Sequence, residues 1–384
     1  MDKTIKMAEA FPPGEFLKEE LEARNWTQED LANILGRQTS VISSIVNGKR
    51  AISLDIATEL GEAFGTGLEY WMNLERIYRS FLKSKEGHSV FARRAKLYAK
   101  APVGEMKKRN WIKPSNDWSV LEQEVLHLLE INSLDEQPRV FSHAAKKATP
   151  YEEAITPAQT AWFFRARDLA RGIQAGKFSD DSFANTMNKV KSLLINPEDI
   201  RQVPKILAEG GIRFLVVENI AHSKIDGACF WLDEYSPVIA MTIRYDRLDN
   251  FWYVASHECG HIKNRDGLNQ EYPIIDVNLV GEEATPFSDK SDIEQRADLF
   301  AQSTLIDQAA LEHWIARTAP LYSKMKITAF ARMNHIHPAL VLGQLQHRGE
   351  VHWSHSREML VKIRHLITSS TLTDGFGQVL PSSA

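Results

Sequence analysis

The stretch DNFWYVASHECGH, from Asp249 to His261, decides how the second half of the chain is built. Its apolar residues, Phe251 and Val254 among them, recur at three- and four-residue spacing, which indicates one face of an amphipathic helix. Asp249 is a candidate cap for the start of that helix. At about 100° per residue, His261 returns to within about 40° of His257, so the sequence predicts both imidazoles on one helix face.

Residues 257–261 read His-Glu-Cys-Gly-His, the H-E-x-x-H pattern of zinc sites, in which His257 and His261 bind the metal. Glu258 is expected to be the general base. It takes a proton from a metal-bound water, whose pKa zinc lowers towards about 7, and passes the proton to the leaving amine of a peptide bond. Cys259 falls at about 200° on the same helical wheel, so we expect it in the core.

A catalytic zinc site needs a third protein ligand and one open position. Our candidate ligand is Glu294, which opens a helix expected from about Asp292 to Ile306. Asp298 lies one turn further along, where it could accept a hydrogen bond from the free ring nitrogen of either histidine and fix its tautomer. Other carboxylates nearby remain alternatives for the third ligand: Glu282, Glu283, Asp289 and Asp292.

Further chemistry around the motif helix stays open at this point. An oxyanion donor could come from any of several side chains that spacing does not separate: Tyr245, Tyr253, Tyr272, His335 and His337. Cys229 has two interpretations, a thiolate that occupies the open metal position or a buried strand residue. The strand from Pro237 to Tyr245 leads towards the motif helix, and if it is a free sheet edge a substrate could add to it as an extra strand.

The chain of 384 residues has the length of two or three domains and an ordinary globular composition. Short β-type runs begin at Arg213, Ala228 and Pro237, whereas most other segments have helical periodicity. We therefore expect an α+β, mostly α, fold. A helical middle region is expected over residues 115–205, a zincin-like domain with a small sheet over 206–352, and a partly disordered tail, rich in Ser, Thr and Gly, over 353–384.

Charge is distributed unevenly, although the net charge of −4 excludes an overall basic coat. From Arg76 to Lys113, twelve Lys or Arg stand against two Glu, a local net charge of +10. Residues 81–114 are expected to form a basic helical linker, which either is a solvated helix or lies along a phosphate backbone. The two cysteines, the absence of a long apolar run and the lack of a secretory signal predict a cytoplasmic protein with no membrane partner.

Residues 14–79 read as a run of short amphipathic helices. The pattern Thr27-Gln-Glu-Asp30 is a capping box that opens one helix, Gly36 ends that helix, and Asn47-Gly48 ends the next. Only a very short turn separates these two helices. This spacing is typical of a helix-turn-helix, so we expect an all-α domain of that kind over residues 1–80.

These motifs carry resemblances to two known families. Residues 13–32, 45–53 and 70–74 closely resemble HigA-type antitoxins with an Xre-family helix-turn-helix. The second half resembles ImmA/IrrE-family zinc metallopeptidases in Gly227, Pro237-Val-Ile, the motif helix and Glu294-x-x-Ala-Asp-x-Phe-Ala301. The second resemblance implies that Glu294 completes a Zn²⁺ site and that the domain hydrolyses peptide bonds, with Asp298 standing where Asn is commoner.

For the first domain, the resemblance implies that double-stranded DNA is the partner. The N-terminal part of the second helix of the motif faces base edges in the major groove, and base contacts are expected from Gln38, Thr39, Ser40, Ser43 and Ser44. Phosphate contacts are expected from Gln28, Asn47, Lys49 and Arg50. Because one such domain reads little sequence, we expect a homodimer on a palindromic operator.

The two halves together suggest a transcription regulator with its own zinc endopeptidase, which cleaves itself or a partner regulator in response to a signal. One alternative is a non-enzymatic antitoxin and autorepressor that neutralises a cognate RNA-cleaving toxin, while the zinc domain only binds or senses. Another alternative is a peptidase fold that has lost zinc and serves as a platform for dimerisation or for a ligand. The substrate, the signal and the operator cannot be deduced from these residues.

Overall fold

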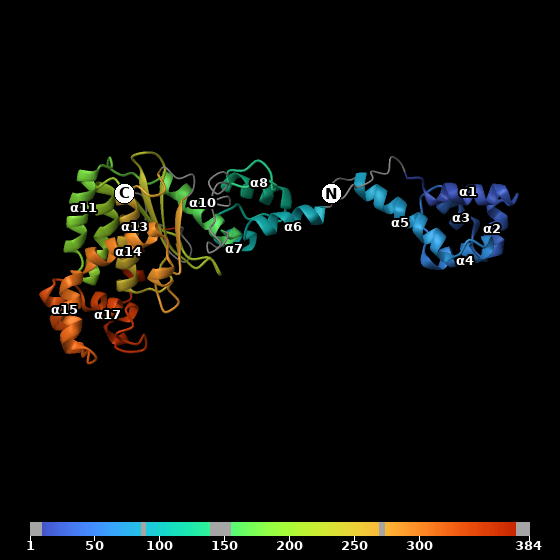
Figure 1. The fold of residues 1–384 in the computed structure, drawn as a ribbon. Helices are drawn as coiled ribbons and strands as arrows, with labels where there is room; N and C mark the ends of the chain where they lie inside the picture. The colour runs from blue at the N-terminus through green and yellow to red at the C-terminus, as the bar shows by residue number, and fades with distance from the viewer. Residues whose placement is uncertain (1–9, 86–89, 139–154, 269–272, 374–384) are drawn as a thin grey trace. The chain divides into compact units, whose positions relative to one another are not determined.

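The computed structural model describes residues 10–85, 90–138, 155–268 and 273–373. The backbone groups into two compact units, residues 1–95 and 96–384, which are described separately below (Figure 1). The structure is mostly helical with one small mixed sheet, so the predicted fold class is confirmed at that level. Within the described ranges, no helix has the combination of length and apolar character that crossing a bilayer requires.

The first unit is built from short helices around one apolar core, coloured blue in Figure 1. Its helices are α1 (Pro13–Ala23), α2 (Gln28–Leu35), α3 (Thr39–Val46), α4 (Leu54–Phe64) and α5 (Leu68–Lys85), followed by α6 (Val90–Lys100), which crosses the border between the units. Leu17, Leu31, Ile42, Leu60 and Trp71 are completely buried in this core. Each helix contributes only one apolar face, and the unit is stable because these faces cover one another.

Local signals define the ends of α2 and α3 as the sequence predicts. The Thr27 hydroxyl accepts a hydrogen bond from the Asp30 amide, while the Asp30 carboxylate accepts from the Thr27 amide, so the capping box is confirmed. Gly36 ends α2 in the left-handed conformation, with a φ of 64° that an L side chain rarely adopts. Residues 36–38 therefore form the short turn of the predicted helix-turn-helix.

The second unit contains a sheet with helices on both of its faces. Its helices are α7 (Val103–Lys108), α8 (Trp118–Leu128), α10 (Pro157–Arg171), α11 (Asp180–Ser192), α12 (Val203–Glu209), α13 (Leu248–Asn264), α14 (Asp292–Leu305), α15 (Gln308–Thr318), α16 (Lys324–Met333), α17 (Pro338–His347) and α18 (Arg364–Ile367), with short 3-10 helices at Pro197–Gln202, Phe287–Asp289 and Arg357–Met359. Its strands are β1 (Arg213–Val216), β2 (Ile225–Trp231), β3 (Pro237–Met241), β4 (Ile274–Val277) and β5 (Leu372–Thr373).

The sheet has the order β4-β2-β3-β1-β5. β1 is parallel to both β3 and β5, whereas β2 is antiparallel to β3 and β4. The three expected strands are confirmed as β1 to β3, while β4 and β5 are short strands that the sequence analysis missed. The idea that the strand from Pro237 is a free edge is wrong, because β3 pairs with both β2 and β1, whereas β4 and β5 form the two edges of the sheet.

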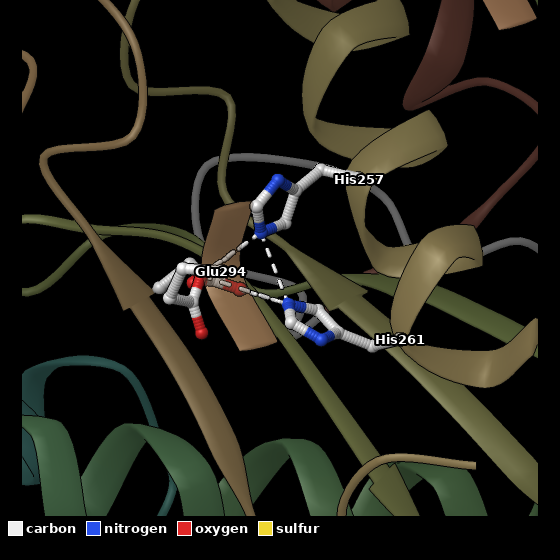
Figure 2. A group of neighbouring side chains, drawn as sticks. His257, His261 and Glu294 are labelled. Atoms are coloured by element: carbon white, nitrogen blue, oxygen red, sulfur yellow. Dashed lines mark hydrogen bonds and ion pairs between the residues drawn. The ribbon is translucent and has the colours of Figure 1, made fainter. Parts of the chain in front are cut away.

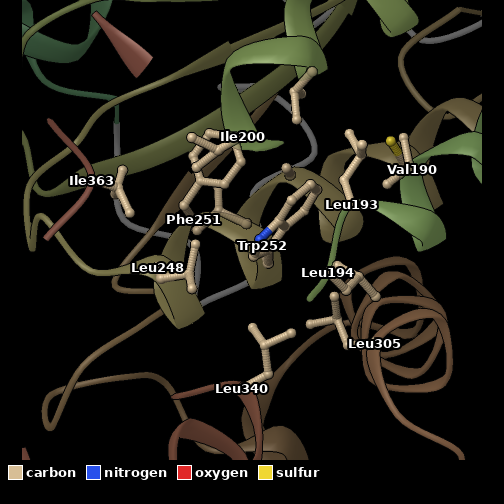
Figure 3. Packing of buried hydrophobic residues seen from close by; sticks show 14 of the residues in the cluster. Val190, Leu193, Leu194, Ile200, Leu248, Phe251, Trp252, Leu305, Leu340 and Ile363 are labelled. Carbon is tan, nitrogen blue, oxygen red and sulfur yellow. The ribbon is translucent and has the colours of Figure 1, made fainter. Parts of the chain in front are cut away.

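The two faces of the sheet bury different cores because successive strand residues point in opposite directions. Phe214 and Ile239 face the core of α13, in which Trp252 is almost fully buried between Phe251 and neighbouring helices (Figure 3). Leu215 and Val217 face the other core, which α8 and α10 cover. The helical middle region, which carries no chemical motif, therefore supplies the back layer of the sheet and much of the packing of α13.

The structure corrects the expected cap of the motif helix. The helix begins at Leu248 and Arg247 is its cap residue, so Asp249 lies inside the first turn rather than before it. The Asp249 carboxylate is buried and accepts hydrogen bonds from the Arg247 guanidinium at 2.6 and 3.1 Å. Arg247 also donates a hydrogen bond to Gln346 on α17. Arg247 therefore connects the start of α13 to α17.

Residues 353–373, expected to belong to a partly disordered tail, are instead part of the second unit. Met359, Ile363 and Leu366 are buried in the core of α13, and β5 pairs with β1. Burial of these apolar side chains explains why residues 353–373 pack into the unit although the segment also contains many polar residues. Residues 374–384 lie outside the described residues.

The basic segment also has internal partners that the charge count did not reveal. Arg109 is buried and donates to the backbone carbonyls of Glu218 and Asn219 at 2.8 and 2.7 Å. Lys96 pairs with Asp135 at 2.8 Å, and Lys107 donates to a backbone carbonyl at 2.9 Å. Several cations from Lys96 onwards therefore form contacts inside the second unit, which corrects the picture of a plain linker over residues 81–114.

Asp226 connects three segments next to the edge strand. Its carboxylate accepts from the Arg244 guanidinium at 3.1 and 3.2 Å and from the Leu279 amide at 2.7 Å, and it is 2% exposed. We expect Asp226→Asn to lower the free energy of unfolding by about 2 kcal/mol, because hydrogen bonds to a buried charge are lost. Urea denaturation measures this, with Asp289→Asn, an exposed residue, as the control. Equal stability of the two variants would contradict the assignment.

Candidate metal centre and nucleic-acid interface

His257 and His261 lie one turn apart on α13 and point their Nε2 atoms at the same spot (Figure 2). The two Nε2 atoms are 3.0 Å apart, and both histidines are completely buried. Glu294, in the first turn of α14, places Oε2 at 3.1 Å from His257 Nε2 and 3.7 Å from His261 Nε2. The three residues proposed as ligands from the sequence are thus brought together by the packing of two helices.

A fourth donor, Asp276 on β4, completes the cluster and was missed by the sequence analysis. Asp276 Oδ1 is 3.6 Å from His257 Nε2, and Oδ2 is 3.7 Å from His261 Nε2. One donor atom from each of the four residues lies within 4.8 Å of all the others. The only signal in the sequence is an aspartate inside the short apolar run Ile274-Ile-Asp-Val277, and such a residue gives no hint of its partners.

Carboxylates also contact the remaining ring nitrogen of each histidine. His257 Nδ1 faces Asp298 Oδ1 at 2.9 Å, as expected for Asp298, and His261 Nδ1 lies 3.0 Å from Asp266 Oδ2. Asp266 was not predicted, because it follows the end of α13, where Arg265 adopts a left-handed conformation. The Asp266 contact is a hydrogen bond that holds the Nδ1 proton of His261 and directs its Nε2 towards the cluster. Asp298 forms an ion pair with His257 at the same ring position, without the geometry of a hydrogen bond.

Asp298 is itself held by two further donors. Lys290 Nζ lies 2.7 Å from Asp298 Oδ2, and the Tyr253 hydroxyl donates to Oδ1 at 2.9 Å. Burial tends to raise the pKa of Asp298, but His257 and Lys290 outweigh it and hold the pKa below its usual value. Asp298 therefore stays ionised and able to form an ion pair with His257.

Glu258 is fully buried beside the cluster, next to Gly227 on β2. A Cβ atom at Gly227 would lie 2.1 Å from Glu258 Oε1, so only glycine leaves room for this carboxylate. Among the residues that the structure describes, neither oxygen of Glu258 has a hydrogen-bond partner. Burial and the charge of Asp276 raise the pKa of Glu258 well above its usual value, which makes the side chain able to hold a proton.

The donor set fits a divalent cation. Burial by itself lowers the pKa of His261, yet hydrogen bonds to Asp266 and Glu294 raise it to about 9, because the surrounding carboxylates stabilise positive charge. In the described part of the chain, Asp276 Oδ2 has no hydrogen-bond partner although it is buried. Two imidazoles and two carboxylates are ligands that Zn²⁺ accepts, and a bound cation would satisfy both the charge and the unpaired oxygen.

The other sequence candidates lie elsewhere. Cys229 and Cys259 are buried in the apolar core and outside the cluster, so the thiolate interpretation of Cys229 is wrong. The alternative ligands lie on the surface and outside the cluster: Glu282, Glu283, Asp289 and Asp292.

Of the proposed oxyanion donors, Tyr253 alone is hydrogen-bonded within this group of side chains, and its hydroxyl donates to Asp298. Nδ1 of His337 accepts from a backbone amide at the start of α17. Tyr245 and His335 are exposed, and Tyr272 lies outside the described residues. The structure therefore selects no oxyanion donor.

The recognition helix of the first unit, α3, begins with three exposed polar residues, Gln38, Thr39 and Ser40. Ser43 and Ser44 are half-buried one turn further along, and the Ser44 hydroxyl donates to the Ser40 carbonyl at 2.7 Å. The exposed polar surface of α3 is therefore its first turn, whereas the Ser44 hydroxyl is engaged within the helix.

Cationic and amide side chains follow α3. Lys49 and Arg50 are exposed, and their amides donate to the Ser44 carbonyl at 2.8 and 3.1 Å, so the backbone that carries them is ordered. Asn47 is exposed as well, and its Nδ2 donates to the Ser43 carbonyl at 2.7 Å. Gln28, at the start of α2, is half-buried.

A contact that the sequence did not suggest fixes the turn between α2 and α3. The Arg37 guanidinium forms a two-point ion pair with the Glu59 carboxylate on α4, with distances of 2.5 and 2.6 Å. The hydrogen bonds to Glu59 raise the pKa of Arg37 and lower that of Glu59. The pair connects the turn to α4 and so orients α3 within the unit.

The support that Asp298 gives to His257 can be tested directly. We expect Asp298→Ala to weaken zinc binding by about 10–100-fold, because the imidazole loses the acceptor that orients it. Competition with a coloured chelator measures the affinity. Asp292→Ala, an exposed carboxylate at the start of the same helix, is the control and should bind like the unchanged protein. An unaltered affinity in Asp298→Ala would mean that Asp298 does not support the metal centre.

Comparisons with known proteins match a part of this chain. An uncharacterised HTH-type transcriptional regulator from Haemophilus influenzae is 41% identical over 63 residues, which are 16% of this chain and 59% of that protein. A solved addiction-module antidote protein of the HigA family from Coxiella burnetii is 31% identical, with a TM-score of 0.19, over 21% of this chain and 97% of that chain. A Pseudomonas aeruginosa protein solved in complex with its operator DNA is 32% identical, with a TM-score of 0.20. The match covers 21% of this chain and 87% of that chain.

The chain thus spans about three fifths of the length of the curated relative. The family model that matches is described as helix-turn-helix, HTH_3, and it covers residues 17–71, from α1 into α5. This match agrees with the capping box, the turn at Gly36 and the exposed start of α3. Residues 17–71 thus match a helix-turn-helix domain.

Proposed function

We propose that the protein is a DNA-binding transcription regulator, similar to HigA, with a fused zinc-dependent endopeptidase that cleaves itself or a partner regulator in response to a signal. The family match of residues 17–71 supports the first part. The single observation that carries the second part is the buried cluster of His257, His261, Glu294 and Asp276 beside the free carboxylate of Glu258.

DNA recognition follows from the surface of the first unit. The exposed first turn of α3 reads base edges in the major groove, and Lys49 and Arg50 contact phosphates on either side of it. The ion pair of Arg37 with Glu59 anchors the turn between α2 and α3 to α4. A homodimer that binds a palindromic operator would supply the affinity that one domain lacks.

In the second unit, His257, His261 and Glu294 would hold the metal, with Asp276 beside them. Zinc, when bound, supplies a Lewis acid that polarises a peptide carbonyl and makes water more acidic. Asp298 and Asp266 fix the orientation of the two imidazoles. Glu258 holds and moves the proton, since burial gives its carboxyl group a raised pKa and Gly227 leaves it space. Peptide hydrolysis is the reaction that this combination supports.

The alternative function is a non-enzymatic antitoxin whose zinc domain only binds or senses. One observation favours it: four protein donors are grouped, and zinc sites that use four protein ligands are structural rather than catalytic as a rule. Glu258 argues for the enzyme, because a structural site has no use for a buried carboxylate with unpaired oxygens.

Metal binding and peptide cleavage can be tested separately. Elemental analysis should find about one zinc per chain in the unchanged protein, and His257→Ala and Glu294→Ala should lose it, because each removes a ligand. Glu258→Gln should keep the metal and lose cleavage of the protein itself or of its operon partners, because the proton acceptor is gone.

Glu282→Ala, which removes an exposed carboxylate, is the matched control and should behave like the unchanged protein. Cleavage by Glu258→Gln at the unchanged rate would remove Glu258 from the mechanism. Absence of zinc after reconstitution would leave a DNA-binding regulator without a metal centre.

The division of labour between the units predicts the effect of Arg50→Ala. Loss of one phosphate contact should weaken DNA binding by a similar factor for all sequences and reduce the slope of log K against log salt by about 1, while zinc stays bound. Fluorescence anisotropy over a range of salt concentrations measures both effects. Lys18→Ala, on α1 and paired with Glu15, is the control. Loss of zinc in Arg50→Ala would contradict the assignment of separate roles.

A further inference from the structure

The four donor residues of the cluster are close enough together to bind one metal ion. The separations of His257 Nε2 from the donor atoms of His261, Glu294 and Asp276 are 3.0, 3.1 and 3.6 Å. His261 Nε2 is 3.7 Å from both carboxylates. A tetrahedral zinc ion with bonds of about 2.0–2.2 Å separates its ligand atoms by roughly 3.3–3.6 Å. The observed distances of 3.0–3.7 Å lie around this range, and Asp276 approaches the two histidines with different oxygens, Oδ1 towards His257 and Oδ2 towards His261.

We infer that Asp276 is the fourth protein ligand and closes the metal centre, so that the structure represents a latent form in which water and substrate have no coordination position. This inference rests on the proposed metal centre. It adds that hydrolysis requires Asp276 to leave, whereas His257, His261 and Glu294 stay. Asp276 is thereby a regulatory ligand, distinct from the three that hold the metal throughout.

The environment of Asp276 supports this role. The side chain is 6% exposed, and its Oδ2 has no hydrogen-bond partner among the described residues. A buried carboxylate without a partner is costly, and within the described ranges no Lys or Arg forms an ion pair with it. The two carboxylates of the cluster balance the charge of one divalent ion, and a bound metal would supply what Asp276 lacks.

The position of Asp276 in the fold makes it the donor that can move. The other three donors lie on α13 and α14, and Asp298 and Asp266 secure the two histidines. Asp276 instead lies on a four-residue edge strand, which in the described chain pairs only with β2. The pairing is irregular here, because a bulge between Ile225 and Gly227 interrupts the register that sets Asp276 opposite Gly227.

The residues just after β4 provide a hinge point for such a movement. Asp226 accepts hydrogen bonds from the amides of Leu279 and Val280 at 2.7 and 3.4 Å, and its charge is paired with Arg244. Displacement of β4 therefore has to break the backbone pairing with β2 at the sheet edge and to withdraw Ile274 from the core of α13 and Ile275 and Val277 from the other core. The movement involves four residues at one sheet edge, which is the scale of a local opening rather than of global unfolding.

Cobalt substitution of the full-length chain tests the inference without use of peptidase activity. Cobalt reports its coordination through its visible absorption, and azide binds only where a coordination position is free or can be freed easily. We compare the unchanged protein, Asp276→Ala, the strand control Val277→Ala and the ligand variant His257→Ala. Zinc affinity is measured in parallel by chelator competition.

We expect azide to leave the cobalt spectrum of the unchanged protein and of Val277→Ala unaltered. Azide should change the spectrum of Asp276→Ala, because this variant has a free coordination position. Zinc affinity of Asp276→Ala should fall by about 100-fold, since loss of a direct ligand costs at least as much as loss of an outer partner. His257→Ala should bind neither metal.

Two results would overturn the inference and leave the metal centre in place. One is that azide alters the spectrum of the unchanged protein as it alters that of Asp276→Ala, which would show an open position. The other is that Val277→Ala and Asp276→Ala lose the same affinity, which would show that the strand rather than the carboxylate matters. If the unchanged protein binds no metal at all, the proposed metal centre fails together with the inference.

Discussion

The close approach of α13 to α14 is the constraint on which the second unit depends. A Cβ atom at Gly260 would lie only 3.0 Å from the Cα atom of Ala297, so the two helices meet backbone to backbone at this point. Glu294 lies one turn before Ala297 and Asp298 directly after it, and the contact therefore delivers one carboxylate to each side of His257. The glycine in the H-E-x-x-H motif thus has a packing role that the motif itself does not specify.

The second constraint is the placement of charge in a dry interior. His257, His261 and Glu258 are completely buried, and each requires a partner or a cation. A chain of ion pairs supplies such partners on one side of the cluster: Lys290 pairs with Asp298, and Asp298 pairs with His257. The outermost cation stabilises a carboxylate that in turn orients a ligand. Buried ion pairs can often be replaced by apolar residues without loss of stability. The presence of these buried charges is therefore consistent with a chemical role.

The first unit solves a simpler physical problem. Its helices are short, and none would be stable alone, but each has its own cap and contributes one apolar face to a common core. The polar residues of α3 that are not needed for that core remain on the surface, where a nucleic acid can be contacted. In the function proposed above, a change in the cluster of His257, His261, Glu294 and Asp276 would be the event that alters cleavage or DNA binding.

The sequence by itself determined the features that depend on neighbours along the chain. The capping box of Thr27 and Asp30, the turn at Gly36, the helix that places His257 and His261 on one face, and the helix that begins with Glu294 all follow from local spacing. These features were predictable because a helix brings residues three and four apart together whatever surrounds it.

Only the tertiary structure decided which distant residues meet. Asp276 joined the cluster because a four-residue strand pairs with β2 in one register, and Asp266 because the chain turns at Arg265 after α13 ends. Glu59 met Arg37 across two helices, and the segment after residue 353 became part of the core through β5 and its apolar neighbours. Such contacts depend on strand register, loop closure and mutual burial, which are properties of the folded chain as a whole and leave no mark in the spacing of residues.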